Sequence, residues 1–186
     1  LHNTTGSNNT AHGTMALYTN TTGSNNTAIG HYANVSLNNL TNATAIGNYA
    51  EVDGSNRVRI GNTDVTQIGG QVAWSNLSDK RGKEQIGEIA FGLDFIRSLK
   101  PAVFKLKNGN GRWDLGFIAQ DIEELVGTEY NLLGIGGTEE RKLSLRYTDF
   151  IAPMVSAMQE QQEIIDKQQR TIEEHQAQIS NQQSYI

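Results

Sequence analysis

The feature that most constrains the fold is a repeat of seventeen residues near the start of the chain. A Thr-Ala-x-Gly motif begins at Thr10, Thr27 and Thr44, and an alanine follows three residues after each of its glycines. The preceding six residues, 4–9, recur unchanged as residues 21–26. Such a short period, with room for one or two brief strands and Asn/Gly turns, is typical of a β-solenoid or β-roll whose coils stack on one another.

The composition of the repeat region limits the core that it can build. Residues 1–50 contain no Asp, Glu, Lys or Arg, but they contain eleven Asn and ten Thr. Few large apolar side chains are present, so an ordinary globular core is excluded. Three coils are thin for a single chain, and we expect the roll to gain its core by association with other chains. Composition alone also permits a disordered linker, although a linker has no reason to keep a fixed register.

The boundary of the repeat region is blurred by weaker copies of the motif. Residues 57–61 and 67–69 echo it irregularly, so we place the roll at residues 1–70 and a linker at 71–77. The first coil carries His12 where the later coils have isoleucine. We therefore expect that coil to be frayed or truncated.

Overall composition excludes several classes of protein. The chain lacks cysteine, which excludes disulfide scaffolds, thiolate metal sites and cysteine nucleophiles. A net charge of -5 and a pI near 5.3 argue against a nucleic-acid partner. No run approaches the roughly 20 apolar residues that a membrane span needs, and the start lacks a signal pattern. We expect a soluble protein with no membrane insertion, no metal and no cofactor.

The C-terminal segment, residues 148–186, predicts a long helix in a trimeric coiled coil. It contains no glycine and repeats with a period of 3.5 residues, which indicates a coiled coil. The apolar a positions, our predicted trimer seam, are Ile151, Met158, Ile165, Ile172, Ile179 and Ile186. The d positions are Met154, Gln161, Gln168, His175 and Gln182. Polar d layers fit the central channel of a trimer better than a tight dimer, and His175 is read as a polar core layer, with a pH switch or an anion site as the alternatives.

The segment between roll and coil predicts a compact α+β core at residues 78–147. Apolar residues spaced by three and four predict a helix over residues 84–99, which Pro101 ends. Two hairpins and a short helix should follow, with strands at 102–106, 113–118, 131–135 and 142–147, turns at 108–111 and 136–138, and the helix at 121–125.

A candidate catalytic motif, Ser-Asp-Lys-Arg-Gly-Lys, lies at the start of this core, from Ser78 to Lys83. Taken alone, Ser78 is a plausible cap or turn residue, and the charges that follow are a solvated face. A serine hydroxyl becomes a nucleophile when a base accepts its proton, and a lysine is such a base only when neutral. Because a lysine amine ordinarily has a pKa near 10.4, burial or neighbouring cations such as Lys80 and Arg81 must lower it. A nearby Asp79 would oppose that change.

Several motifs in this order resemble a known family. The string Ser-Asp-x-Arg-x-Lys is followed by Leu-x-x-Ile-x-x-Leu-x-Pro-x-x-Phe at 93–104, by Gly-Phe-Ile-Ala-Gln at 116–120, and by Tyr147 leading into the heptad helix. Together they resemble the C-terminal intramolecular chaperone of phage endosialidases and tailspikes. The resemblance runs from about Ser78 to the end of the sequence.

This resemblance implies a trimer that helps the preceding β-structured fibre to fold and then cuts itself off as a Ser-Lys serine endopeptidase. The dyad would be Ser78 and Lys83, and the scissile bond would be Leu77/Ser78. No cofactor is implied. The supporting motif residues are Asp79, Arg81, Gly116, Phe117 and Gln120.

The Thr-Ala-Ile-Gly-x-x-Ala repeats resemble the head repeats of trimeric autotransporter adhesins, which form left-handed parallel β-rolls in intertwined trimers and also occur in phage tail fibres. The two resemblances imply a virion protein, a tail fibre or tailspike assembled in the cytoplasm of a bacterial host. They also imply three kinds of partner: two further copies of the chain, an upstream fibre domain of the same chain, and a host-surface receptor.

Two other functions compete with self-cleavage. The chain could be a passive trimeric fibre tip or adhesin that binds a host receptor without cutting itself. A fibre that degrades host glycans is disfavoured within this chain, since residues 1–50 hold no carboxylate and glycoside hydrolysis usually needs two. Such a domain would lie upstream of Leu1.

Overall fold

The computed structural model describes residues 2–84, 86–137 and 141–184. The chain forms two compact units, and each combines segments that are far apart in the sequence. The first unit contains the repeats and two later segments, in the ranges 1–75, 101–119 and 134–144. The second unit contains the ranges 76–100, 120–133 and 145–186.

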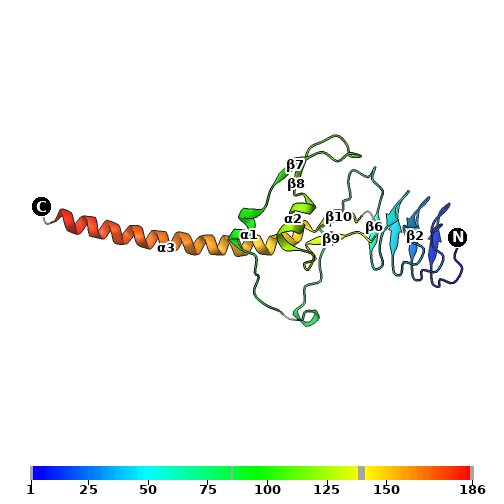
Figure 1. Cartoon of the computed structure of the whole chain (residues 1–186), viewed down its shortest axis with the longest axis horizontal. Coiled ribbons are helices and arrows are strands. Elements are labelled where there is room, and N and C mark those ends of the chain that lie inside the picture. Colours follow the sequence, from blue (N-terminus) through cyan, green and yellow to red (C-terminus); the bar gives the residue numbers. More distant parts are fainter. Residues whose placement is uncertain (1, 85, 138–140, 185–186) are drawn as a thin grey trace. The chain divides into compact units, whose positions relative to one another are not determined.

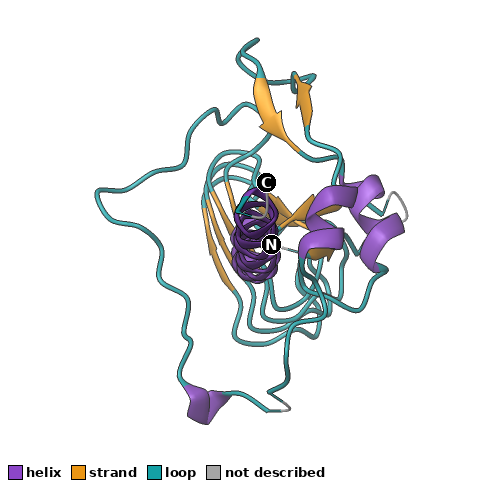
Figure 2. Ribbon diagram, turned by 90° about the vertical axis from the view of Figure 1, so that its left-hand side faces the viewer, coloured by secondary structure: helices purple, strands orange, loops and turns teal. Residues whose placement is uncertain are grey.

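The repeats form stacked coils, as predicted (Figure 1). Their strands are β1 (Thr10–His12), β2 (Thr27–Ile29), β3 (Asn34–Val35), β4 (Thr44–Ile46), β5 (Glu51–Val52) and β6 (Val58–Ile60). One parallel sheet has the order β1-β2-β4-β6, and β3 pairs with β5 in a second parallel sheet. Ala11 faces Ala28, and Ala28 faces Ala45, so the register equals the seventeen-residue period. Figure 2 shows the coils one behind another.

The ends of the roll differ from the sequence expectation in two ways. The first coil is not frayed at His12, which lies in register opposite Ile29. The weaker echo at 57–61 is a true last coil, because Ile60 pairs with Ile46. This coil is three residues shorter than the others, so the seventeen-residue period ends there. Residues 67–69 form no strand.

The roll interior is made of small residues and buried amides. Its buried apolar cluster consists of Ala16, Leu17, Ala28, Ala33, Val35, Leu40, Ala43, Ala45, Ala50 and Val52. Asn26 is fully buried, and its amide donates to Leu40 O at 2.6 Å and to Asn20 Oδ1 at 3.1 Å. Its oxygen accepts from Ala43 N at 2.9 Å. These bonds replace the water that a buried amide loses, so an Asn-rich chain can have an ordered interior.

The corners of the coils use residues that tolerate a left-handed backbone. Asn25 has φ 60° and Gly30 has φ 133°. A Cβ at Gly30 would lie 2.5 Å from Gly47 O, because successive coils approach closely there. Glycine is therefore required at this corner both by conformation and by space.

The rest of the chain is α+β and ends in a long helix, as predicted. Its elements are η1 (Lys80–Gly82), α1 (Leu93–Ser98), β7 (Ala102–Phe104), β8 (Asp114–Gly116), α2 (Ala119–Val126), β9 (Leu133–Ile135), β10 (Leu143–Leu145), η2 (Tyr147–Phe150) and α3 (Ile151–Gln183). β7 and β8 form an antiparallel hairpin, and β9 pairs with β10. Both hairpins were predicted. Thr138, in the predicted second turn, lies outside the described residues.

The predicted helix over 84–99 is wrong in its first half. α1 begins only at Leu93, because Gly92 has the non-helical angles φ -126° and ψ -139°. A Cβ on Gly92 would overlap the carboxylate of Glu160. That carboxylate accepts from Leu93 N at 2.8 Å and so satisfies an amide at the start of α1.

The second unit has a small aromatic core. The ring of Phe95 lies 6.5 Å from that of Phe150 and 4.7 Å from that of Phe91. Phe91 also contacts Tyr130, with the ring centroids 4.8 Å apart. α2 adds the fully buried Ile122. The ring contacts join α1 to Tyr130 and to η2, which leads into α3.

The predicted seam of α3 is open to solvent in the part of the chain that the structure describes. The predicted seam residues are 47–68% exposed, namely Ile151, Met158, Ile165, Ile172 and Ile179. Ile186, the last of the predicted seam, lies outside the described residues. The helix starts at Ile151 rather than at Thr148, because the residues before it form the 3-10 turn η2. Among the described residues, no helix is both long and apolar enough to cross a membrane.

Candidate functional site

Ser78 and Lys83 are in contact. The Lys83 ammonium donates a hydrogen bond from Nζ to Ser78 Oγ over 2.8 Å. The contact is produced by the turn η1, which folds the chain back on itself between the two residues. Two backbone bonds close the turn, from Gly82 N to Asp79 O and from Lys83 N to Lys80 O, both of 3.1 Å. The five-residue spacing therefore does bring these two side chains together.

Asp79 organises this turn. Its backbone is extended, and its carboxylate accepts from Arg81 N at 2.9 Å as the cap of η1. The same carboxylate receives the Arg81 guanidinium in a fork, with Nε at 3.1 Å from each oxygen and the terminal nitrogen at 2.5 Å. The geometry is that of a charge-assisted bidentate pair.

This pairing changes the electrostatic roles that the sequence suggested. The side chain of Arg81, and then its amide, hold the pKa of the Asp79 carboxyl below its ordinary value. Asp79 in turn raises the pKa of Arg81. A lowered carboxyl pKa means that the pair and its turn persist above the usual aspartate pKa of about 3.9 and weaken as the pH falls through the lower folded-state value. Arg81 was expected to act as a neighbouring cation for Lys83, but its charge is already paired.

The surroundings of the dyad are open in the single chain. Ser78 and Lys83 are both exposed. Directly upstream, Leu77 is 96% exposed, and Val72 and Trp74 are each 82% exposed. Three large apolar side chains within six positions of the sequence are thus open to solvent in the single chain.

The other predicted site residues lie on different elements. Gly116 ends β8, Phe117 follows it, and Gln120 is in the first turn of α2. The turn η1 thus brings together four of the predicted residues, namely Ser78, Asp79, Arg81 and Lys83. No group of three His, Cys, Asp or Glu side chains in the described ranges 2–84, 86–137 and 141–184 could hold a metal ion.

Two contacts near the functional segments were not expected from the sequence. Glu160 caps α1 across 67 positions of sequence, and no local motif indicates this. Arg57 of the last coil donates to Ile135 O, at 2.5 Å, across 78 positions. In the sequence, the Gly136-Gly137 pair beside Ile135 indicates only a hairpin turn.

Comparison with known proteins finds a family match for one segment of the chain. Residues 78–130 match the model of a peptidase family described as Chaperone of endosialidase. The match begins at Ser78 and covers less than a third of the chain. It supports an intramolecular chaperone role for this part of the protein. No curated protein and no solved structure matches the chain.

Proposed function

We propose that this chain is an intramolecular chaperone that trimerises, folds the β-structured segment before it, and then releases itself by cutting Leu77/Ser78. The observation that carries the proposal is the 2.8 Å contact between Lys83 Nζ and Ser78 Oγ. It lies at the first residues of the segment that matches the chaperone family. An exposed peptide bond directly precedes it.

The chemistry is an acyl transfer within one residue. Ser78 Oγ attacks the carbonyl carbon of Leu77 while Lys83, as the neutral amine, takes the hydroxyl proton. The C–N bond of Leu77/Ser78 then breaks, and the proton passes to the leaving nitrogen, which becomes the new α-amine of Ser78. The Leu77 acyl group is left as an ester on Ser78 Oγ. Water hydrolyses this ester, giving a carboxylate on Leu77 and restoring the serine hydroxyl.

Assembly is proposed as the trigger. A lysine amine that is open to water is protonated at neutral pH, so a base role requires that the site be covered. The exposed side chains of Val72, Trp74 and Leu77 are the surface that a neighbouring chain would cover. Burial against that chain would exclude water and favour the neutral amine. Cleavage would then report a correctly assembled trimer.

Exposed apolar rows in both halves of the chain support a homotrimer. On the roll, Ile29, Ile46 and Ile60 are in register on one sheet and are 38–43% exposed. On α3, the predicted seam is exposed along the whole described helix. A trimeric β-roll and a trimeric coiled coil would cover these rows. Polar d layers make the coil suited to registering three chains rather than to holding them permanently.

Within this proposal, Asp79 and Arg81 are positioning residues. They hold the turn that brings Lys83 to Ser78, and the bidentate pair keeps the carboxylate of Asp79 occupied. Gly116, Phe117 and Gln120 are assigned to the site only through the family motif.

The wider context follows from the same family. The chain would belong to a phage tail fibre or tailspike, assembled in the cytoplasm of the bacterial host, with an upstream fibre domain as cargo and a host-surface receptor as a later partner. A passive fibre tip or adhesin is the alternative, and it differs in one respect that can be measured. A passive tip stays in one piece.

The test is the variant Ser78→Ala, compared with the unmodified chain. We expect the variant to form the same trimer by sedimentation but to stay whole, while the unmodified chain gives fragments of 77 and 109 residues. Both fragments in the Ser78→Ala sample, seen by denaturing mass analysis, would remove Ser78 as the nucleophile.

A further inference from the structure

The proposed cut does not coincide with the division of the molecule into compact units. Residues 101–119 and 134–144 follow Ser78 in the sequence, yet they are in one unit with the roll. Cutting at Leu77/Ser78 would therefore leave the two fragments in contact through these segments. The nature of that contact decides whether the fragments separate.

The first part of the contact is a hydrogen-bonded clamp. In the last coil, the Arg57 guanidinium donates to Asp53 Oδ1 at 3.0 Å and to Ile135 O, at the end of β9, at 2.5 Å. The Arg57 and Asp53 side chains are 40% and 16% exposed. The Arg57 guanidinium thus links Asp53, in the roll fragment, to a backbone carbonyl of the chaperone fragment.

The second part is a close approach of two backbones. A Cβ on Gly137 would overlap Asp53 O, and a Cβ on Gly136 would lie 2.9 Å from Asp53 Oδ2. Neither glycine has a positive φ. Space rather than backbone conformation therefore requires glycine at both positions.

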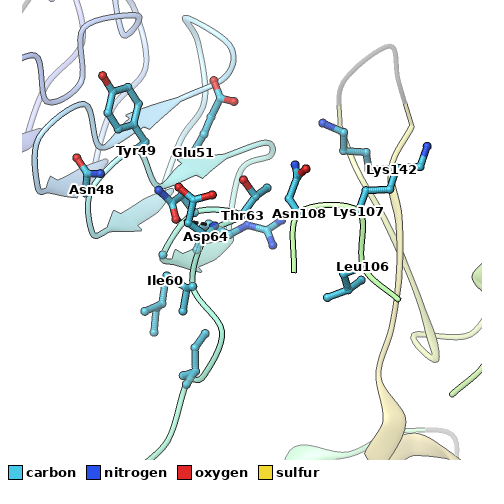
Figure 3. A pocket seen from close by; sticks show the side chains of 15 residues that line it. Asn48, Tyr49, Glu51, Ile60, Thr63, Asp64, Leu106, Lys107, Asn108 and Lys142 are labelled. Atoms are coloured by element: carbon cyan, nitrogen blue, oxygen red, sulfur yellow. Dashed lines mark hydrogen bonds between the residues drawn. The ribbon is translucent and has the colours of Figure 1, made fainter. Parts of the chain in front are cut away.

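The third part is a groove of about 960 Å³ between the last coil and the tip of the β7–β8 hairpin, with charged side chains on both faces (Figure 3). The roll supplies Glu51 and Asp64, with Arg59 as its one lining cation. Across the groove, the other fragment supplies Lys107 and Lys142. Described side chains of opposite charge therefore face each other across the groove, and attraction across such a solvent-filled gap is sensitive to salt.

Apolar side chains also line the groove, but they remain open to water: Ile60, Val65, Ile68 and Leu106 are 39–61% exposed. The buried apolar cluster of the roll runs from Ala16 to Val52, and among the described residues it includes none after Ser78. Stable interfaces usually have an apolar core inside a polar rim. At this contact the described residues form no buried apolar core.

We infer that, after cleavage, the chaperone fragment stays on the last coil of the roll through a polar seam that opens as ionic strength rises. The seam is defined as Arg57 and Asp53 against Ile135, Gly136 and Gly137, together with the groove beside them. Its partner is the roll fragment of the same chain. The inference rests on the proposed function for the position of the cut.

The experiment compares association of the two fragments at about 0.1 M and about 1 M NaCl, where the Debye length falls from roughly 10 to 3 Å. Native size-exclusion chromatography reads association, and denaturing mass analysis of the same samples reads cleavage. A second version of the chain carries a protease recognition sequence between Gly70 and Gln71, where the chain is exposed. It gives separate fragments even if the chain does not cut itself, so failure of self-cleavage and failure of the seam are distinguishable.

We expect the fragments to co-elute at the lower salt concentration and the free chaperone fragment to increase at least about tenfold at the higher one. Gly137→Ala should separate the fragments already at low salt, since its Cβ overlaps Asp53 O. Arg57→Ala should do the same. Gly87→Ala is the matched control, because a Cβ there meets nothing within 4 Å.

Hydrogen exchange in the strands of the roll checks that each variant is folded. Three results would overturn the inference: fragments that remain together at high salt, a folded Gly137→Ala chain whose fragments associate as in the control, or unmodified fragments that do not co-elute at low salt.

Discussion

Replacement of Lys83 by arginine tests whether Lys83 acts as a general base or only as a positive charge. Arginine keeps the positive charge and the reach, but its guanidinium cannot give up a proton in a protein. The Nζ–Oγ distance of 2.8 Å lies within the range that proton transfer requires. Arg81 cannot serve as the base for the same reason, and its guanidinium is bound to Asp79. We therefore expect the cleavage rate to fall by the full value of a general base, about 10²- to 10⁴-fold, or roughly 3–5 kcal/mol in the barrier.

The assay is denaturing mass analysis of aliquots taken over time from purified trimer. Lys80→Arg is the matched control: it makes the same substitution within the turn, at a residue that takes no part in the dyad. Native mass analysis of both variants checks that trimers form. A Lys83→Arg chain that cleaves within about threefold of the control rate would refute the role of Lys83 as base, since general-base catalysis contributes far more than that.

Two further predictions concern the folds that carry the site. Asn26→Ala should destabilise the roll by about 3 kcal/mol, because it removes three side-chain hydrogen bonds and leaves their buried partners unsatisfied. Hydrogen exchange of the roll strands should then be roughly a hundredfold faster, and Asn39→Ala, at an exposed asparagine, should change it little. Gly92→Ala should displace the Glu160 carboxylate and so remove its hydrogen bond to Leu93 N, at a cost of about 0.5–1.5 kcal/mol. Exchange protection at the start of α1 should fall, and unchanged protection would show that this cap does not stabilise α1.

The stacked coils could be predicted because the motif that specifies each coil is short and recurs at a fixed spacing. Ala11, Ala28 and Ala45 pair in the register that the period sets. The last coil was seen only as a weak echo, because it is shortened and its strand pairs Arg59 with Ala45. Spacing detects a regular period but not a coil that differs in length and composition.

The turn between Ser78 and Lys83 was also predictable, because five residues and one cap determine it. The partner of Arg81 was not. Its sequence neighbours offered both a carboxylate and an amine, and only geometry shows that the guanidinium binds Asp79. The start of α1 was missed for a different reason, since Glu160, far along the chain, occupies the space beside Gly92.

The seam between the last coil and the β9–β10 hairpin depends on contacts of the same long-range kind. From the sequence alone, Gly136-Gly137 indicates only a turn. Its close approach to Asp53 becomes visible only once the coils have stacked and the hairpin has formed.

The central claim is tested most directly by the intact mass of the unmodified chain, measured immediately after purification and again after ageing. We predict that the full-length mass declines and that two masses replace it, one ending at Leu77 and one of 109 residues with a free amine on Ser78. A full-length mass that persists in an assembled trimer, or fragments whose junction lies elsewhere in the chain, would contradict self-cleavage at this bond.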